Sequence, residues 1–300
     1  MNVRVRDLLC VLSCTFSMAA SAVEAARDPV AWDPRPQDPP PFMDAVAIPS
    51  GAARMNGIVY VPGGEGPHPV AIVLHGLPGN ERNLDLAQVL RRDGWAVVFF
   101  HYRGAWGSGG EFGFGHVLED VDAALDWSLG DEARERFRLD EGPRALVGHS
   151  MGGFAALVAG GGNGAVGCIA SMAGADLGNL GLAAREEPAA GQVRTAFDAL
   201  LEGPLRGTDG TAMLAELQTH GEQWRFESRV EALKAHRVLL VASERDEVAA
   251  PAANHDPLLA ALVQADADVT SVLLDDDHAF SGTRVALARE IVNWLALGCR

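Results

Sequence analysis

The chain alternates between short, wholly apolar runs and longer segments in which apolar residues recur at helical spacing. A short apolar run bounded by Gly, Pro or polar residues is typical of a strand buried on both faces, whereas the longer period is typical of an amphipathic helix. This alternation predicts an α/β fold with a mostly parallel, eight-stranded sheet and helices on both faces. The runs expected to form strands are Ala45–Ile48, Met55–Val61, Val70–Leu74, Trp95–Phe100, Arg144–Val147, Ala165–Ala170, Arg237–Ala242 and Val269–Leu274.

Helices are expected between most of these strands, and one long stretch is expected to contain helices alone. No strand pattern is evident at about 174–233, which predicts a short helical lid inserted between two strands. Its apolar residues could line an acyl pocket or simply pack helix on helix; they are Leu177, Leu180, Leu182, Phe197, Leu201 and Trp224. The expected helices are Asn80–Arg92, His116–Leu129, Phe154–Ala159, Gln192–Leu201, Thr211–Gln218, Ala252–Ala265 and Thr283–Leu297.

The first residues resemble an export signal. A basic start is followed by the apolar stretch Leu8–Met18, which is too short to span a bilayer as a helix. Cleavage after Ala22 predicts a signal peptide over residues 1–22 and an exported protein, periplasmic or secreted; cleavage after Ala25 is a second choice. Two alternatives stay open: a lipid anchor at Cys14 and an uncleaved N-terminus. Residues 23–44 are rich in proline and predict an arm or tether before the main domain at 45–300.

Composition narrows the class of partner. The formal charge of −16 argues against nucleic acid, since a phosphate-binding surface needs excess Lys and Arg. Cys168 and Cys299 would remain after signal cleavage; they make neither a disulfide framework nor a metal spacing, and Cys168 reads as a small core residue. The glycine-rich stretch 104–110 does not open a helix in the dinucleotide pattern. No metal, no cofactor and no membrane span are therefore expected.

Candidate chemistry begins at the pattern Gly-x-Ser-x-Gly over residues 148–152, with Ser150 at its centre. The pattern lies between the apolar run Arg144–Val147 and the helix-forming segment Phe154–Ala159, which is the setting of a nucleophile elbow. Such a tight turn needs glycine at both flanks, and it holds the hydroxyl above the sheet edge beside free helix N–H groups. We expect Ser150 to be a nucleophile; the alternative is a glycine-rich turn with a buried serine.

A catalytic serine needs a base to take its proton, and the base needs a carboxylate to orient it. Both are expected at the ends of strands that follow Ser150 in the sequence. His278 follows the last strand and is the expected base, with His101 and His116 as remaining alternatives. Asp246 follows the strand Arg237–Ala242 and is the expected acid. Glu244 and Glu247 are its rivals, and Asp275, Asp276 and Asp277 read as solvated. His75 and His149 are expected to pack or hydrogen-bond within loops, and His68, His220, His236 and His255 to lie at the surface or in loops.

The negative charge on a tetrahedral intermediate also needs hydrogen-bond donors. One expected donor is the backbone N–H of Met151, directly after the serine. The other is expected from the loop after Leu74, where we choose the N–H of Leu77 because Pro78 has none. All of these groups follow the carboxyl ends of predicted strands, which is where open α/β sheets bind ligands.

Taken together and in this order, the motifs resemble the α/β-hydrolase superfamily over roughly residues 59–297. Within it, the chain is similar to the prolyl-oligopeptidase-like, dienelactone-hydrolase-like and serine-aminopeptidase-like branches. The resemblance implies the α/β-hydrolase fold, with Ser150 as nucleophile, Asp246 as acid and His278 as base. The motifs are HGLPG at 75–79, HYRGAWGSGG at 101–110, GHSMGG at 148–153, ERDEVAAP at 244–251 and DDHAF at 276–280.

The expected activity is that of a metal-free serine hydrolase acting through an acyl-enzyme on a small ester, thioester or amide. A small-peptide or proline-specific peptidase is the second reading. The large peptidases of the superfamily carry a β-propeller and this chain shows a short lid instead, so long peptide substrates are not expected. Two further uses of the fold stay open, a non-catalytic binding protein and a lyase or haloperoxidase that employs the same three residues.

Overall fold

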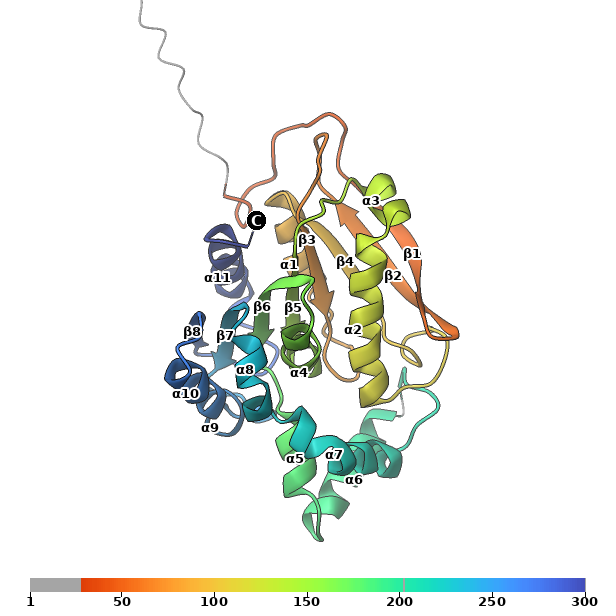
Figure 1. The fold of residues 1–300 in the computed structure, drawn as a ribbon, viewed down its shortest axis with the longest axis vertical. Helices are drawn as coiled ribbons and strands as arrows, with labels where there is room; N and C mark the ends of the chain where they lie inside the picture. Colours follow the sequence, from red (N-terminus) through yellow and green to blue (C-terminus); the bar gives the residue numbers. More distant parts are fainter. Residues whose placement is uncertain (1–27, 202, 300) are drawn as a thin grey trace, which may run out of the picture.

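The computed structural model describes residues 28–201 and 203–299, so the expected signal at 1–22, with Cys10 and Cys14, lies outside the described residues. An eight-stranded sheet has the strand order β1-β2-β4-β3-β5-β6-β7-β8 (Figure 1). The pairs β1–β2 and β2–β4 are antiparallel and the others are parallel, which confirms the predicted mostly parallel sheet. The strands are β1 Phe42–Ser50, β2 Ala53–Val61, β3 Val70–Leu74, β4 Ala96–Phe100, β5 Arg144–His149, β6 Val166–Met172, β7 Arg237–Ser243 and β8 Val269–Leu274.

Helices cover both faces of the sheet because successive side chains of a strand point to opposite sides. In β3, Val70, Ile72 and Leu74 belong to the core that includes α2, α4 and α10, whereas Ala71 and Val73 belong to the core under α1 and α11. Strands β3 and β4 are therefore apolar at every position. The helices are α1 Leu84–Arg92, α2 Phe114–Leu129, α3 Asp131–Phe137, α4 Met151–Val158, α5 Leu177–Ala183, α6 Ala189–Leu201, α7 Gly210–Trp224, α8 Val230–Leu233, α9 Pro251–Asn254, α10 Asp256–Gln264 and α11 Arg284–Ala296, with 3-10 turns at Gly160–Gly162 and Phe226–Arg229.

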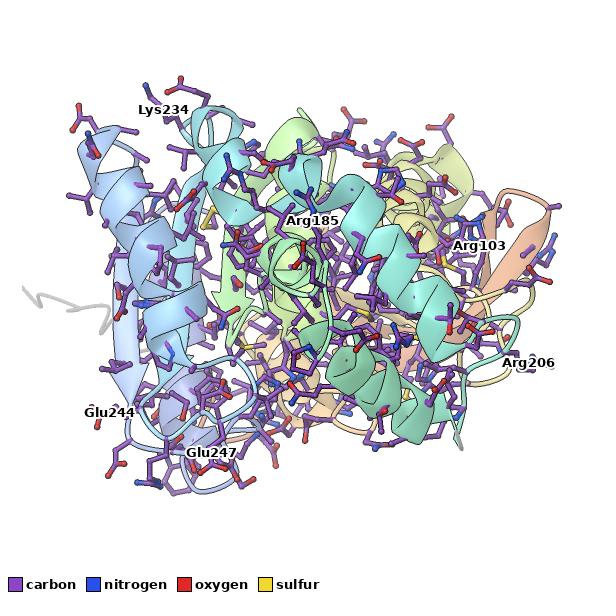
Figure 2. All side chains as sticks on the ribbon, turned by 90° about the horizontal axis from the view of Figure 1, so that it is seen from below. Arg103, Arg185, Arg206, Lys234, Glu244 and Glu247 are labelled. Atoms are coloured by element: carbon purple, nitrogen blue, oxygen red, sulfur yellow. A yellow bond between two sulfur atoms is a disulfide. The ribbon has the colours of Figure 1, made fainter. Side chains whose placement is uncertain are left out.

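The stretch between β6 and β7 contains helices and no strand in its described residues, as the sequence predicts. Its helices α5, α6 and α7 lie together below the sheet in Figure 1 and in front of it in Figure 2. Two of its expected pocket residues pack against the main domain: the ring of Phe197 contacts Phe114 on α2, and that of Trp224 contacts Phe154 on α4. These two side chains therefore anchor the insertion to the two helices beneath it.

Several element boundaries differ from the sequence prediction. The helix expected from Asn80 begins at Leu84, because Asn83 has the left-handed φ of 56° that a helix cannot include. The single helix expected over 252–265 is divided into α9 and α10 near His255, where Pro257 supplies no N–H to continue the first helix. Helices α3, α5 and α8 were not predicted, because each is only seven residues long or shorter.

The first strand starts at Phe42, inside the stretch 23–44 that the sequence assigns to a proline-rich arm. It pairs with β2 along its whole length, from Phe42 opposite Val61 to Ser50 opposite Ala53. The described part of the arm lies on the surface rather than hanging free: Pro29 O accepts from Arg92 Nε at 2.7 Å, and Asp28 pairs with Arg289 at 2.8 Å.

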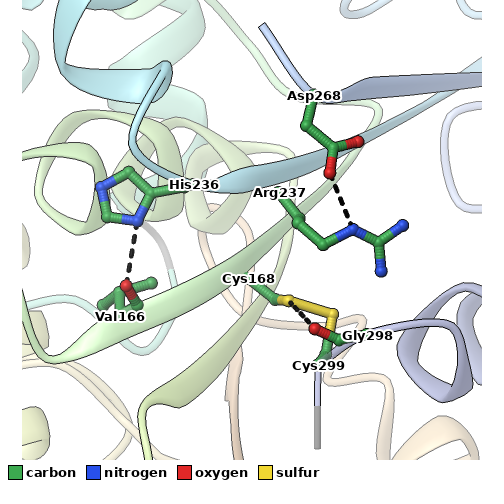
Figure 3. The surroundings of a disulfide bond; sticks show 7 residues. All are labelled: Val166, Cys168, His236, Arg237, Asp268, Gly298 and Cys299. Carbon is green, nitrogen blue, oxygen red and sulfur yellow. Dashed lines mark hydrogen bonds and ion pairs between the residues drawn. A yellow bond between two sulfur atoms is a disulfide. The ribbon is translucent and has the colours of Figure 1, made fainter.

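Cys168 and Cys299 form a disulfide, which corrects the prediction that the two cysteines make no disulfide framework (Figure 3). Cys168 is buried on β6, as expected of a core residue, and Cys299 follows α11. Their Cα atoms are 5.9 Å apart although 131 positions separate them in sequence. Such a cross-link stabilises a fold mainly by restricting the unfolded chain, and here it ties the C-terminal segment to the middle of the sheet.

Candidate active site

Ser150 lies in a sharp turn between β5 and α4, as the sequence predicts. Its backbone has φ 55° and ψ −119°, a strained conformation that belongs to neither a strand nor a helix. A Cβ at Gly148 would lie 2.0 Å from Gly152 O, and a Cβ at Gly152 would lie 2.1 Å from Leu74 O. Only glycine fits these two positions, so the local sequence is what allows the turn.

The three predicted side chains meet in one hydrogen-bonded line. Ser150 Oγ lies 2.9 Å from His278 Nε2, and His278 Nδ1 lies 2.7 Å from Asp246 Oδ2. Ser150 follows β5, His278 follows β8 and Asp246 follows β7. These strands are parallel and therefore end at the same edge of the sheet. Because the carboxylate only accepts, His278 carries its proton on Nδ1, and Nε2 is free to accept the serine proton. The arrangement can deprotonate a hydroxyl and stabilise the imidazolium that results.

Asp246 is the one carboxylate of its loop that is buried. Its side chain is fully covered, and its Oδ1 accepts the N–H groups of Val248 and Ala249, each at 2.8 Å. Burial alone would raise its pKa, but the hydrogen bonds from His278 and these amides outweigh burial and keep the pKa below its ordinary value. Its sequence rivals Glu244 and Glu247 are exposed, at the margin of the molecule in Figure 2.

Asp276 was expected to be solvated, and this prediction is wrong. Its carboxylate is buried and accepts from Thr283 Oγ1 at 2.7 Å and from Gly282 N at 2.9 Å. These bonds, the Thr283 hydroxyl foremost, hold its pKa below the ordinary value. Asp276 thus closes the turn that carries His278, a role that periodicity cannot reveal because its partners come later in the chain. Asp275 and Asp277 are exposed, as expected.

The predicted oxyanion donors flank Ser150. Met151 is the first residue of α4, and Leu77 follows β3 in a loop that packs against the elbow, since a Cβ at Gly76 would lie 2.9 Å from Ser150 Cβ. Within residues 28–201 and 203–299, neither amide N–H has a hydrogen-bond partner. Both amides are therefore available to an oxygen bound beside Ser150, which is what the predicted role needs.

Other histidines support the site rather than compete for it. His149 is buried, and its Nε2–H donates to the backbone oxygen of His278 at 2.8 Å. His75 is buried beside the Leu77 loop, as expected of a packing residue. His68 and His236 lie in loops, as the sequence predicts, and both are buried; the ring of His236 contacts the carbonyls of Val166 and Gly161. In the described part of the chain, no group of three His, Cys, Asp or Glu is placed to hold a metal ion.

We expect the free energy of unfolding to fall when the pH is lowered from 7 to 5. Burial lowers the pKa of His75 and of His149 from 6.5 to about 4 in the folded protein. Between these values the unfolded chain binds more protons, so stability is complete above pH 6.5 and is lost as the pH falls. Each histidine should lower the free energy of unfolding by about 2 kcal/mol at pH 5. Urea unfolding at both pH values measures this loss.

The variant His149→Gln keeps a donor for the His278 carbonyl and removes one titrating group. It should lose less stability between pH 7 and pH 5 than the wild type, by about 2 kcal/mol. An equal loss in the two proteins would show that His149 does not contribute to the acid sensitivity.

The fold is that of the α/β-hydrolase class. Within that class, residues 65–181 match the family described as serine aminopeptidase, S33. None of the curated proteins matches the chain. No helix among the described residues is long and apolar enough to cross a membrane.

Solved structures with the same fold include esterases and a peptidase. Est1E from Butyrivibrio proteoclasticus is 18% identical with a TM-score of 0.62, over 84% of this chain and 98% of its own. The Pyrococcus furiosus esterase Pf2001 is 14% identical with a TM-score of 0.62, over 85% and 91%. A puromycin-hydrolyzing peptidase of Mycobacterium tuberculosis is 17% identical with a TM-score of 0.63, over 86% of this chain but 39% of its own. At these identities the likeness establishes the fold, and the family match supports a hydrolase.

Proposed function

We propose that the protein is a serine hydrolase that forms and breaks an acyl-enzyme on Ser150 and acts on a small ester, thioester or amide. The observation that carries the proposal is the line of contacts from Ser150 Oγ through His278 to Asp246, at 2.9 and 2.7 Å. Asp246 ends this line as a buried acceptor, so the imidazole is held in the tautomer that a general base requires.

The reaction follows from these positions. Ser150 Oγ attacks the carbonyl carbon of the substrate while its proton passes to His278 Nε2, and the carbonyl oxygen becomes an oxyanion facing the amides of Leu77 and Met151. Collapse of this intermediate breaks the bond to the leaving group, which takes the proton from His278. Water, deprotonated by the same imidazole, then hydrolyses the acyl-enzyme and restores the serine hydroxyl.

Esters are the preferred substrate class, and a peptidase is the second candidate. The match to the serine aminopeptidase family favours a peptidase. The two esterases, however, are covered over nearly their whole length, while the peptidase neighbour is covered over 39% of its chain. We further propose that the insertion at about 174–233 acts as a lid over the acyl site, because its helices pack on α2 and α4 beside the elbow.

An exported location is also proposed. The Cys168–Cys299 disulfide supports it, because disulfides persist mainly in oxidising compartments.

Active-site labelling and a comparison of two substrates test the proposed activity. A fluorophosphonate should label the protein once, at Ser150, and kcat/KM for a short-chain aryl ester should exceed that for an amino-acyl anilide by about tenfold or more, given the better leaving group. The reverse preference would establish the peptidase reading. Absence of labelling at Ser150 in folded protein would favour a non-catalytic binding protein.

A further inference from the structure

A pair of histidines lies behind the loop that carries the Leu77 amide. His75 is almost fully buried, and its ring contacts those of Phe99 and Tyr102, with centroids 5.9 and 4.7 Å apart. Its Nδ1 lies 2.7 Å from Gly76 O, and its Nε2 lies 3.2 Å from His101 Nδ1. Both ring nitrogens of His75 are therefore used, one by the backbone of the loop and one by His101.

The protons on this pair can be placed from the partners. A carbonyl oxygen only accepts, so His75 carries its proton on Nδ1 and has a lone pair on Nε2. The contact at 3.2 Å then requires His101 to donate its Nδ1–H to that lone pair. Both rings are neutral, since burial lowers the pKa of His75 to about 4 and that of His101 to about 3. His101 thus donates a hydrogen bond to His75, and His75 donates one to Gly76 O.

The last bond of this series acts on the peptide that contains the Leu77 N–H. Gly76 O and Leu77 N–H belong to one planar trans peptide unit, so they point in opposite directions. A hydrogen bond that holds the oxygen toward His75 therefore directs the N–H away from it, and it also polarises the amide as a donor. The same loop packs against the elbow, since a Cβ at Gly76 would lie 2.9 Å from Ser150 Cβ.

Trp106 supports the same loop from the other side of His101. Its indole stacks on the imidazole of His101 with ring centroids 5.8 Å apart, and its Nε1–H donates to Pro78 O at 2.7 Å. The carbonyls on both sides of Leu77 are thus held by side chains of one ring cluster, formed by His75, His101 and Trp106.

Given the proposed hydrolase function, we propose that His101 is a positioning residue of the oxyanion hole. By donating to His75 Nε2, it holds His75 in the orientation in which Nδ1–H binds Gly76 O and thereby directs the Leu77 N–H toward the reacting oxygen. Without that donor, the buried Nε2 of His75 is unsatisfied, and the ring is free to turn away from the loop.

Two variants of His101 test the proposal on an aryl ester. His101→Phe keeps a ring against Trp106 but removes the hydrogen-bond donor. In this variant kcat should fall about 10- to 100-fold, while KM should change little. The affinity for an alkyl boronic acid should fall by the same factor as kcat. His101→Asn keeps an N–H near the position of Nδ1 and should restore both values to near wild type. Wild-type activity and boronic acid affinity in His101→Phe would overturn the proposal, as would equal impairment of both variants at an unchanged melting temperature.

A matched control and a direct measurement complete the test. His68→Phe replaces a buried imidazole before the opposite end of β3 and should leave kcat and boronic acid affinity unchanged. In the wild type, imidazole ¹⁵N shifts should show His75 protonated on Nδ1 and His101 unprotonated on Nε2; the opposite assignment for either ring overturns the proposal even if no variant folds. If Ser150→Ala is inactive while His101→Phe is fully active, only this inference fails, whereas an active Ser150→Ala removes the proposed function itself.

Discussion

Replacing Ser150 with alanine is expected to lower kcat for an aryl ester by about 10⁴- to 10⁶-fold. The variant removes the hydroxyl oxygen that lies 2.9 Å from His278 Nε2, in the strand-to-helix turn beside the amides of Leu77 and Met151. Substrate binding and the oxyanion donors remain, so KM should change much less than kcat. Steady-state kinetics with a single short-chain ester measures both quantities.

The chain offers a matched control for this substitution. Ser271 Oγ lies 3.0 Å from His255 Nε2, and His255 Nδ1 lies 2.9 Å from Asp256 Oδ1, so the same three residue types meet a second time. Ser271, however, is an exposed residue in the middle of strand β8 and does not lie in a strand-to-helix turn. Ser271→Ala should therefore turn over like the wild type. Full turnover by Ser150→Ala would show that the proposed mechanism is wrong.

The variant Asp246→Asn should lower kcat by about 10⁴-fold while the fold is kept, the size of effect known for the equivalent change in a serine protease. The backbone amides of Val248 and Ala249 donate to Asp246 Oδ1, so an asparagine would keep its oxygen there and turn its NH₂ group toward His278. His278 Nδ1 would then have to accept, and its proton would move to Nε2. In that tautomer the imidazole cannot take the serine proton.

The two rival acids of the same loop serve as controls for this prediction. Glu244→Gln and Glu247→Gln change exposed side chains that have no contact with His278, and both should keep kcat within about twofold of the wild type. Melting temperatures should be similar in all three variants. If Asp246→Asn retains more than a tenth of the wild-type kcat, or if a glutamate variant shows the large loss instead, the assignment of the acid is wrong.

Much of the site could be predicted because it depends on patterns of residues that are close together in the sequence. The elbow needs a strand, two glycines and a helix in direct succession, and the residues on either side of Ser150 provide all of these. Parallel strands end at one edge of a sheet, so residues that follow β5, β7 and β8 were expected to meet although the chain separates them. The periodicity that predicts the strands therefore also predicts where Ser150, Asp246 and His278 lie.

What the sequence by itself determined is the fold class, the turn that holds Ser150 and the strand ends that supply its hydrogen-bond partners, because these depend on local patterns and on how parallel strands align. Only the tertiary structure decided which groups are buried and which distant groups touch. Burial distinguishes Asp246 from the exposed Glu244 and Glu247. Hydrogen bonds from residues later in the chain give Asp276 a structural role. It also joined Cys168 to Cys299 across 131 positions, since proximity between distant residues is a property of the packed sheet and leaves no trace in local spacing.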